Sequence, residues 1–170
     1  MLKKIFGDKP LFGAEIGVEK GEHSLQILQS LNVKLLHCID PWIEFKQCGK
    51  DYWGSGLGEN LYQTTCKNLE HFQNVKIIRK LSLEAVKMFQ DNSLDFVYID
   101  ANHQYESVKA DILAWYPKVK VGGVLSGHDY CDIWVGVKQA VNEFSQGFNF
   151  KFEHAPSIDT AIDDWYGLKG

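Results

Sequence analysis

The sequence lacks several features that would assign it to a class at once. Its 170 residues contain no apolar run approaching about 18 residues, so no segment predicts a membrane-spanning helix. Acidic residues outnumber basic ones by 22 to 18, and the lysines and arginines are not clustered, which argues against a nucleic-acid partner. The N-terminal stretch MLKKIFGDKP has no apolar core of signal-peptide length. We therefore expect a cytoplasmic protein with no membrane or nucleic-acid partner.

Cysteines are few and scattered, and they form no C-x-x-C pair. They are Cys38, Cys48, Cys66 and Cys131. This pattern is typical of reduced thiols in an intracellular protein rather than of disulfides or zinc ligands. The chain also has no internal repeat and no linker-like tract. Its length and its apolar content of 45% indicate one ordinary folded domain over residues 1–170.

What is present is an alternation of short apolar runs and helical patterns. The expected strands are 11–17, 33–40, 75–79, 93–100 and 119–129, followed by two more within 148–154 and 160–168. The expected helices are 22–31, 60–72, 83–90, 106–116 and 135–144. Strands that alternate with helices indicate a parallel sheet covered on both faces. We predict an α/β, doubly wound (Rossmann-like), mostly parallel seven-stranded sheet with an antiparallel C-terminal edge strand.

Polar residues follow the first expected strand, where open α/β sheets bind their ligands. The stretch A-E-I-G-V-E-K-G contains Glu15, Gly17 and Gly21. Glycines at this point permit a tight turn and a close approach of a ligand to the backbone. A dinucleotide site favours G-x-G-x-x-G, whereas this chain has G-x-x-x-G, and Glu15 suits a cationic or hydroxyl-bearing ligand. The alternative is a structural glycine turn beside an acid.

The second and third expected strands also end in polar residues. Asp40 lies 19 residues beyond Gly21, where an acid can accept hydrogen bonds from ribose hydroxyls. Trp42 could stack on a base. The alternative is a helix-capping Asp40 and a core Trp42. Ser82, after the third strand, either caps the next helix or contacts a ligand.

The fourth and fifth expected strands end in acids and histidines. Asp100, Asn102 and His103 follow one strand, and His128 and Asp129 follow the other. Two carboxylates at neighbouring strand ends repel each other unless they are protonated or bridged by a cation, and Mg²⁺ prefers such oxygen ligands. Alternatively, Asp100 or Asn102 caps the following helix, and His128 is a histidine with structural partners.

Taken in order, these motifs resemble those of class I S-adenosylmethionine-dependent methyltransferases, over essentially the whole chain. A-E-I-G-V-E-K-G resembles their first motif, and C-I-D-P-W resembles their ribose-binding motif. D-F-V-Y-I-D-A-N-H-Q-Y with V-G-G-V-L-S-G-H-D-Y is similar to a small-molecule O-methyltransferase subgroup related to macrolide-sugar and cephalosporin-type enzymes. The resemblance implies S-adenosylmethionine as cofactor and methyl transfer to a hydroxyl of a small molecule.

The resemblance also implies where the cofactor binds. Glu15 would lie near its amino group and ribose, and Asp40 would bind the ribose hydroxyls. Trp42 would flank the adenine, and Ser82 and Leu83 would lie at its edge. The implied cofactor-binding residues are Glu15, Gly17, Gly21, Asp40, Trp42, Ser82 and Leu83.

The implied catalytic residues are Asp100 and His103. Asp100 and Asp129 match acids that hold a divalent metal such as Mg²⁺ in the metal-dependent members. His103 falls where catechol-type enzymes place a lysine base, which makes it the candidate general base. Tyr130 stands where that metal site has an asparagine, so a third protein ligand is missing or comes from His128.

Three hypotheses for function follow, together with one for specificity. Beside the methyltransferase stand a nicotinamide-dependent oxidoreductase and a non-catalytic methyltransferase-fold binding module. The segment 43–59, with Tyr52 and Trp53, is the best place for acceptor specificity, unless it is only a surface excursion. Because the chain lacks most of the N-terminal helical cap of larger relatives, a homo-oligomer could supply a lid.

Overall fold

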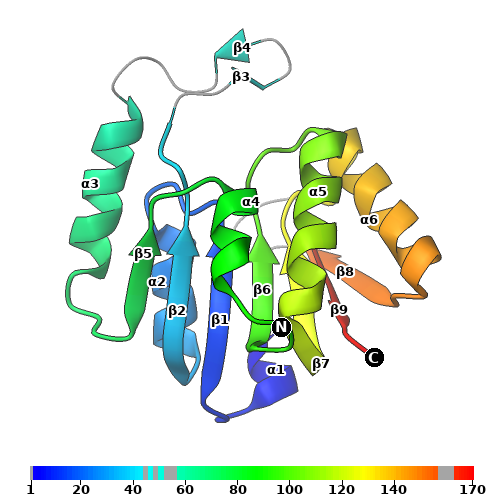
Figure 1. Cartoon of the computed structure of the whole chain (residues 1–170), viewed down its shortest axis with the longest axis horizontal. Coiled ribbons are helices and arrows are strands. Elements are labelled where there is room, and N and C mark those ends of the chain that lie inside the picture. Colours follow the sequence, from blue (N-terminus) through cyan, green and yellow to red (C-terminus); the bar gives the residue numbers. More distant parts are fainter. Residues whose placement is uncertain (1, 44–45, 48–49, 52–56, 157–162) are drawn as a thin grey trace.

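A seven-stranded sheet forms the centre of the molecule (Figure 1). The computed structural model describes residues 2–43, 46–47, 50–51, 57–156 and 163–170. The strand order is β5-β2-β1-β6-β7-β9-β8. The strands are β1 (Leu11–Ile16), β2 (Val33–Ile39), β5 (Val75–Ile78), β6 (Leu94–Ile99), β7 (Val119–Gly127), β8 (Phe152–Pro156) and β9 (Asp163–Leu168). From β5 to β7 all neighbours are parallel, whereas β9 is antiparallel to both β7 and β8.

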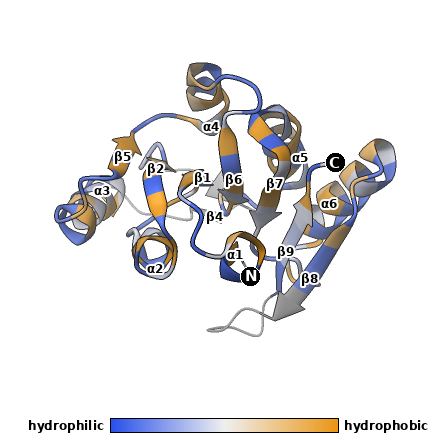
Figure 2. Cartoon of the chain, turned by 90° about the horizontal axis from the view of Figure 1, so that it is seen from below, coloured by the Kyte–Doolittle hydropathy of each residue, from blue (hydrophilic) through white to orange (hydrophobic). Residues whose placement is uncertain are grey.

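Helices cover both faces of this sheet. They are α1 (Leu2–Phe6), α2 (Glu22–Ser30), α3 (Leu57–Leu69), α4 (Ser82–Ala85), α5 (Tyr105–Trp115) and α6 (Val135–Phe148), with 3₁₀ turns η1 (Val86–Met88) and η2 (Tyr116–Lys118). Figure 2 shows α1 and α2 below the sheet and α4 and α5 above it. Among the described residues, no helix is long and apolar enough to cross a membrane.

The buried apolar residues form one cluster on each face of the sheet. One cluster joins the sheet to α5 and α6, where Val137, Val141 and Phe144 lie three or four residues apart and so share one helix face. The other joins it to α1, α2 and α3 through Ile27 and Leu61, among others. Because both faces are covered, the central strands are apolar on both sides, which is why they appear as continuous apolar runs in the sequence.

The predicted fold is confirmed, and its C-terminal edge is refined. The sheet has seven strands among the described residues, and an antiparallel pair lies at the expected edge. Within that pair β8 is the edge strand, because β9 inserts between β7 and β8. Helix α1 was not expected, nor was the small ladder of β3 (Lys46–Gln47) and β4 (Lys50–Asp51). Tyr52 and Trp53, assigned to acceptor specificity, lie outside the described residues.

The direction of the strands decides which residues meet. The carboxyl ends of the five parallel strands share one edge of the sheet. Since β9 runs the other way, it is its beginning that lies at this edge, and Trp165 pairs with Gly127 at the end of β7. Asp164 is thereby brought beside His128, although the two are far apart in sequence.

Candidate functional site

A cavity of about 1070 Å³ opens at the carboxyl edge of the sheet. Its wall combines the segments that follow β1, β2, β5, β6 and β7 with the start of β9. The sequence-predicted residues on this wall are Glu15, Gly17, Asp40, Ser82, Leu83, Asp100, His103, His128 and Asp129. Thus most of the predicted site residues meet in one cavity, as expected for an open α/β sheet.

Gly17 is required by the close approach of two strand ends. Its φ of 87° lies in the left-handed region, and a Cβ built on it would lie 1.8 Å from the carbonyl oxygen of Asp100. The backbone N–H of Gly17 donates to Ile39 at 2.9 Å, and the N–H of Asp100 donates to Ile16 at 2.7 Å. The loop after β1 therefore fits tightly between β2 and β6, and only glycine fits there.

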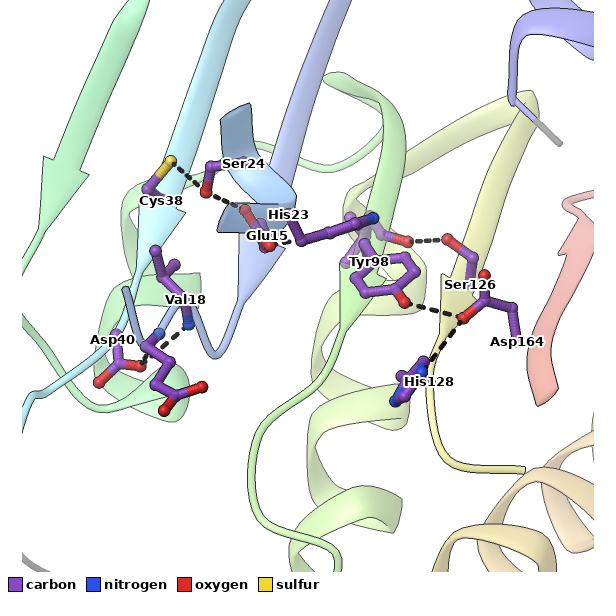
Figure 3. A network of polar contacts seen from close by, with 12 residues as sticks. Glu15, Val18, His23, Ser24, Cys38, Asp40, Tyr98, Ser126, His128 and Asp164 are labelled. Carbon is purple, nitrogen blue, oxygen red and sulfur yellow. Dashed lines mark hydrogen bonds and ion pairs between the residues drawn. The ribbon is translucent and has the colours of Figure 1, made fainter. Parts of the chain in front are cut away.

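Asp40 fixes the same loop from the end of β2. Its Oδ2 accepts hydrogen bonds from the backbone N–H groups of Val18 and Glu19, at 2.9 and 3.1 Å (Figure 3). Its Oδ1 accepts one from the N–H of Trp42 at 2.7 Å. Burial raises the pKa of the Asp40 carboxyl, and the three N–H donors oppose that rise. The carboxylate therefore holds the loop in place, and Asp40 also lines the cavity.

The structure places Trp42 in the core and not on the cavity wall, where the resemblance would have it flank the adenine. Its side chain is 1% exposed, and Trp42 is not among the described residues that line the cavity. A φ of 46° turns the chain back, so the indole N–H donates to the carbonyl of Glu19 at 2.8 Å and the ring packs against Tyr62. The alternative of a core tryptophan is the one the structure bears out. Pro41 and Ile43 line the cavity beside Asp40 instead.

Gly21, predicted to line the cofactor through its backbone, lies at the start of a helix instead of on the cavity wall. Gly21 is the N-cap residue of α2 with a φ of 78°, and a Cβ on it would lie 3.2 Å from Thr65 of α3. It is absent from the described lining of the cavity. Gly21 therefore serves the start of α2 and its packing against α3.

Glu15 is buried and has partners within the protein. One carboxylate oxygen accepts a short hydrogen bond from the hydroxyl of Ser24, and the other lies 2.9 Å from Nδ1 of His23 (Figure 3). The thiol of Cys38 in turn donates to Ser24 at 3.3 Å. Glu15 thus ties the first turn of α2 to β1, and its contact with the cavity is shared with His23.

His23 was not singled out from the sequence. Its ring packs against Tyr98, with the ring centroids 4.1 Å apart, and lines the cavity. Burial alone lowers the pKa of His23, but the hydrogen bond and the charge of Glu15 outweigh this effect, and the pKa is raised. The one signal in the sequence was its position, two residues after Gly21 at the start of the expected helix.

Ser82 neither caps a helix nor offers a free hydroxyl. It is the first residue of α4, whose N-cap is Leu81, and no side chain caps that end. Its hydroxyl donates to Asp111 at 2.5 Å and accepts from the indole N–H of Trp115 at 2.8 Å. Burial raises the pKa of Asp111 to about 6. Leu83 is 46% exposed and presents an apolar side chain to the cavity.

Asp100, His103 and Asp129 form a compact group at the ends of β6 and β7. One ligand atom from each lies within 4.8 Å of the others. Nε2 of His103 lies 2.6 Å from Asp129 and 3.7 Å from Asp100, and its ring stacks on Trp134. Burial alone lowers the pKa of His103, but its bonds to Asp100 and Asp129 raise it to about 9. At neutral pH this group is therefore held together by a protonated imidazole.

His128 connects this group to Asp164. Its Nδ1 lies 3.3 Å from Asp129, and its Nε2 lies 4.0 Å from Asp164, which accepts a hydrogen bond from the hydroxyl of Tyr98 at 2.9 Å (Figure 3). The hydrogen bond to Asp129 raises the pKa of His128. Although burial opposes it, bonding to His103 and His128 holds the pKa of Asp129 well below its usual range. Asp164 and Tyr98 were missed in the sequence because only the sheet topology brings them here.

Asn102 has a local structural role. Its Oδ1 accepts a hydrogen bond from the backbone N–H of Gln104, the N-cap residue of α5, at 2.8 Å. This closes the turn that follows Asp100 and leads into the helix. Asp100 itself is left facing the cavity, with 36% of its side chain exposed.

The sequence of this chain matches a methyltransferase-domain family model and two proteins that are described as uncharacterized. A family model described as a methyltransferase domain matches residues 14–130. Uncharacterized protein R132 of Acanthamoeba polyphaga mimivirus is 32% identical over 135 residues, which cover 77% of this chain and 57% of that protein. Uncharacterized protein y4gI of Sinorhizobium fredii is 33% identical over 73 residues, 42% of this chain and 8% of that protein. The chain therefore spans just over half of the first relative and a small part of the second.

Solved structures show the same fold at low sequence identity. The precorrin-6y C5,15-methyltransferase of Geobacter metallireducens superposes with a TM-score of 0.71 at 15% identity, over 99% of this chain and 85% of that one. The O-methyltransferase NovP gives 0.66 at 19%, over 94% and 72%. Spermidine synthase from Thermotoga maritima gives 0.66 at 16%, over 98% and 56%. With the family model spanning most of the chain, this protein belongs to the S-adenosylmethionine-dependent methyltransferase-domain family.

Proposed function

We propose that this chain transfers the methyl group of S-adenosylmethionine to a hydroxyl of a small molecule, with a divalent cation assisting. The observation that carries the proposal is that one cavity joins the glycine loop after β1 to the group of Asp100, His103 and Asp129. Methyl transfer from a sulfonium is an in-line displacement, so the protein's main task is to align donor and acceptor. The two ends of this cavity supply one place for each.

The residues at the β1 and β2 ends fit the cofactor. The loop at Gly17 leaves no room for a Cβ, which brings bare backbone to the cavity wall. Asp40 presents a buried carboxylate beside it, suited to ribose hydroxyls. Leu83 and Ile43 offer apolar surface for a base. We assign the cofactor to Gly17, Asp40 and Leu83, with Ser82 on the cavity wall beside Leu83.

The Asp100, His103 and Asp129 group fits a divalent cation. The carboxylates of Asp100 and Asp129 lie close enough to share one ion, and His128 could add a nitrogen ligand. The imidazole of His103 holds its proton at neutral pH, so it is left out of this ligand set. Mg²⁺ favours the carboxylates, whereas the nitrogen would suit Mn²⁺ or a similar ion. A cation held there would polarise the acceptor hydroxyl as a Lewis acid.

His103 remains the candidate base on one condition. With a pKa of about 9 it keeps its proton at neutral pH, so it cannot accept another. Its proton is held by bonds to Asp100 and Asp129, and His103 would lose that hold if both carboxylates were engaged elsewhere. His103 would then take the proton of the acceptor hydroxyl.

Calorimetry tests the cofactor assignment. We expect S-adenosylhomocysteine to bind with micromolar affinity and NADH not to bind, and Asp40→Ala to weaken the first. The reverse preference would overturn the proposal in favour of an oxidoreductase. Cofactor binding with no transfer of labelled methyl to a broad panel of hydroxylated acceptors would instead support a non-catalytic module.

The cation is tested separately. Asp100→Ala and Asp129→Ala should each abolish metal-stimulated turnover while S-adenosylhomocysteine still binds. Equal turnover in both variants and the parent would remove the cation from the proposal.

A further inference from the structure

We propose that Asp164 selects the methyl acceptor by binding a protonated amine that the acceptor carries beside its reacting group. This inference rests on the proposed methyl transfer and names the class of acceptor that the same cavity takes. It starts from a carboxylate that the predicted cofactor and cation sites do not use.

Asp164 is oriented by the protein and open to the cavity. Its Oδ1 accepts a hydrogen bond from the hydroxyl of Tyr98 at 2.9 Å, and Nε2 of His128 lies 4.0 Å away. The side chain is 34% exposed and lines the cavity. Figure 3 shows it between Tyr98 and His128. Burial and the neighbouring acids raise the pKa of Tyr98 far above its usual range, so its hydroxyl stays a donor. One carboxylate oxygen is therefore fixed, and the other is available to a ligand.

The charge around Asp164 favours a cationic partner. Nine carboxylates are among the described residues that line the cavity, against two lysines and three histidines. At the acceptor end, Asp100 and Asp164 are each about one-third exposed, while Asp129 is paired with His103. Asp164 lies outside the group that fits a divalent cation, so a bound cation would not occupy it. An ammonium group would gain a charge-assisted hydrogen bond here, whereas a carboxylate would be repelled.

Asp164 also lies outside the part of the chain that the family model matches, where we expect acceptor specificity to differ between family members. The family model ends at residue 130, and it contains the glycine loop, Asp40, Asp100 and Asp129. Asp164 lies beyond it, on β9. The parts common to the family would hold the cofactor, while β9 adds a carboxylate at the acceptor end.

Three matched probes test the proposal on the full chain loaded with S-adenosylhomocysteine. Tyramine, tyrosol and 4-hydroxyphenylacetate share a phenol and carry an ammonium, a hydroxyl or a carboxylate. In calorimetry we expect tyramine to bind at least about tenfold more tightly than tyrosol, with the carboxylate weakest. Asp164→Asn should remove the advantage of tyramine, and Asp164→Glu should retain part of it.

Asp163→Asn is the matched control. The neighbouring Asp163 pairs with His154 at 2.6 Å and is not among the described lining of the cavity, so this variant should keep the order of the three probes. Equal affinity for tyramine and tyrosol, no binding of tyramine, or an unchanged order in Asp164→Asn would each overturn the inference. S-adenosylhomocysteine binding reports separately on the proposed function, and it also shows that each variant is folded.

Discussion

The two ends of the cavity use their polar groups in different ways. At the β1 and β2 end, Asp40 has three backbone N–H partners, and Glu15 is bound to Ser24 and His23. At the β6, β7 and β9 end, carboxylates and histidines pair with one another, and Asp100 and Asp164 remain partly exposed.

The β1 and β2 end is therefore rigid, and we call it the cradle. The β6, β7 and β9 end is a charged surface that can adapt to a ligand. Side chains that are hydrogen-bonded within the protein, as Asp40 is to backbone N–H groups, fix the shape of a site. They change little when a ligand binds. Carboxylates paired with histidines can exchange a partner for a ligand, a cation or a proton. We therefore expect substitutions at the first end to act through backbone geometry, and those at the second end to act through charge.

The largest effect is expected where the cradle has no spare room. Gly17→Ala places a methyl group 1.8 Å from the carbonyl of Asp100, at a φ of 87°. The free energy of unfolding should fall by more than about 4 kcal/mol, and S-adenosylhomocysteine binding should be lost. Gly147→Ala in α6 is the control, since a Cβ there meets nothing within 4 Å. Thermal unfolding and calorimetry measure both, and equal stability of the two variants would contradict the tight fit.

At the charged end, Asp129 should dominate stability. Asp129→Asn leaves the largely buried imidazole of His103 without its closest carboxylate. We expect a loss of about 4 kcal/mol in unfolding free energy at pH 7, measured in urea. Asp132→Asn, which removes an exposed partner of Lys138, should leave the midpoint unchanged. If both variants unfold at the same urea concentration, the pairing around Asp129 does not stabilise the fold.

Asp111, on α5 beside Ser82, should make the stability depend on pH. Burial raises its folded pKa from 3.8 to about 6, so the folded chain keeps a proton that the unfolded chain releases between those values. Stability from this group is therefore fully present below about pH 4 and is lost as the pH rises through 6, by about 3 kcal/mol at most. Asp111→Asn should flatten that slope and stabilise the protein at pH 8. An unchanged slope in urea titrations would show that folding does not raise the pKa of Asp111.

The smallest effect is expected for the two residues near Asp40, where Trp42 lies in the core and Ile43 lines the cavity. Trp42→Phe removes the hydrogen bond to Glu19 and should cost about 1.5 kcal/mol without changing S-adenosylhomocysteine affinity. Ile43→Ala should do the opposite, because Ile43 is 47% exposed and lines the cavity. A loss of affinity in Trp42→Phe with none in Ile43→Ala would restore the tryptophan to the adenine site.

Much of the site could be predicted because its acids directly follow apolar runs in the sequence. Glu15, Asp40, Asp100 and Asp129 each lie in a short stretch that ends an apolar run, and parallel strands bring such ends to one edge. The sequence could not show how each side chain is oriented, toward the cavity or into the core. Trp42 follows Asp40 directly, yet its positive φ sends the ring into the core.

The sequence by itself determined the alternation of strands and helices and the gathering of acids after the parallel strands. Hydrophobic periodicity and turn residues are local properties, so they can be observed along the chain. Only the tertiary structure decided that Tyr98 and Asp164, 66 residues apart, share a hydrogen bond at that same edge. The physical reason is the antiparallel insertion of β9 beside β7, which brings the start of one strand to where the others end.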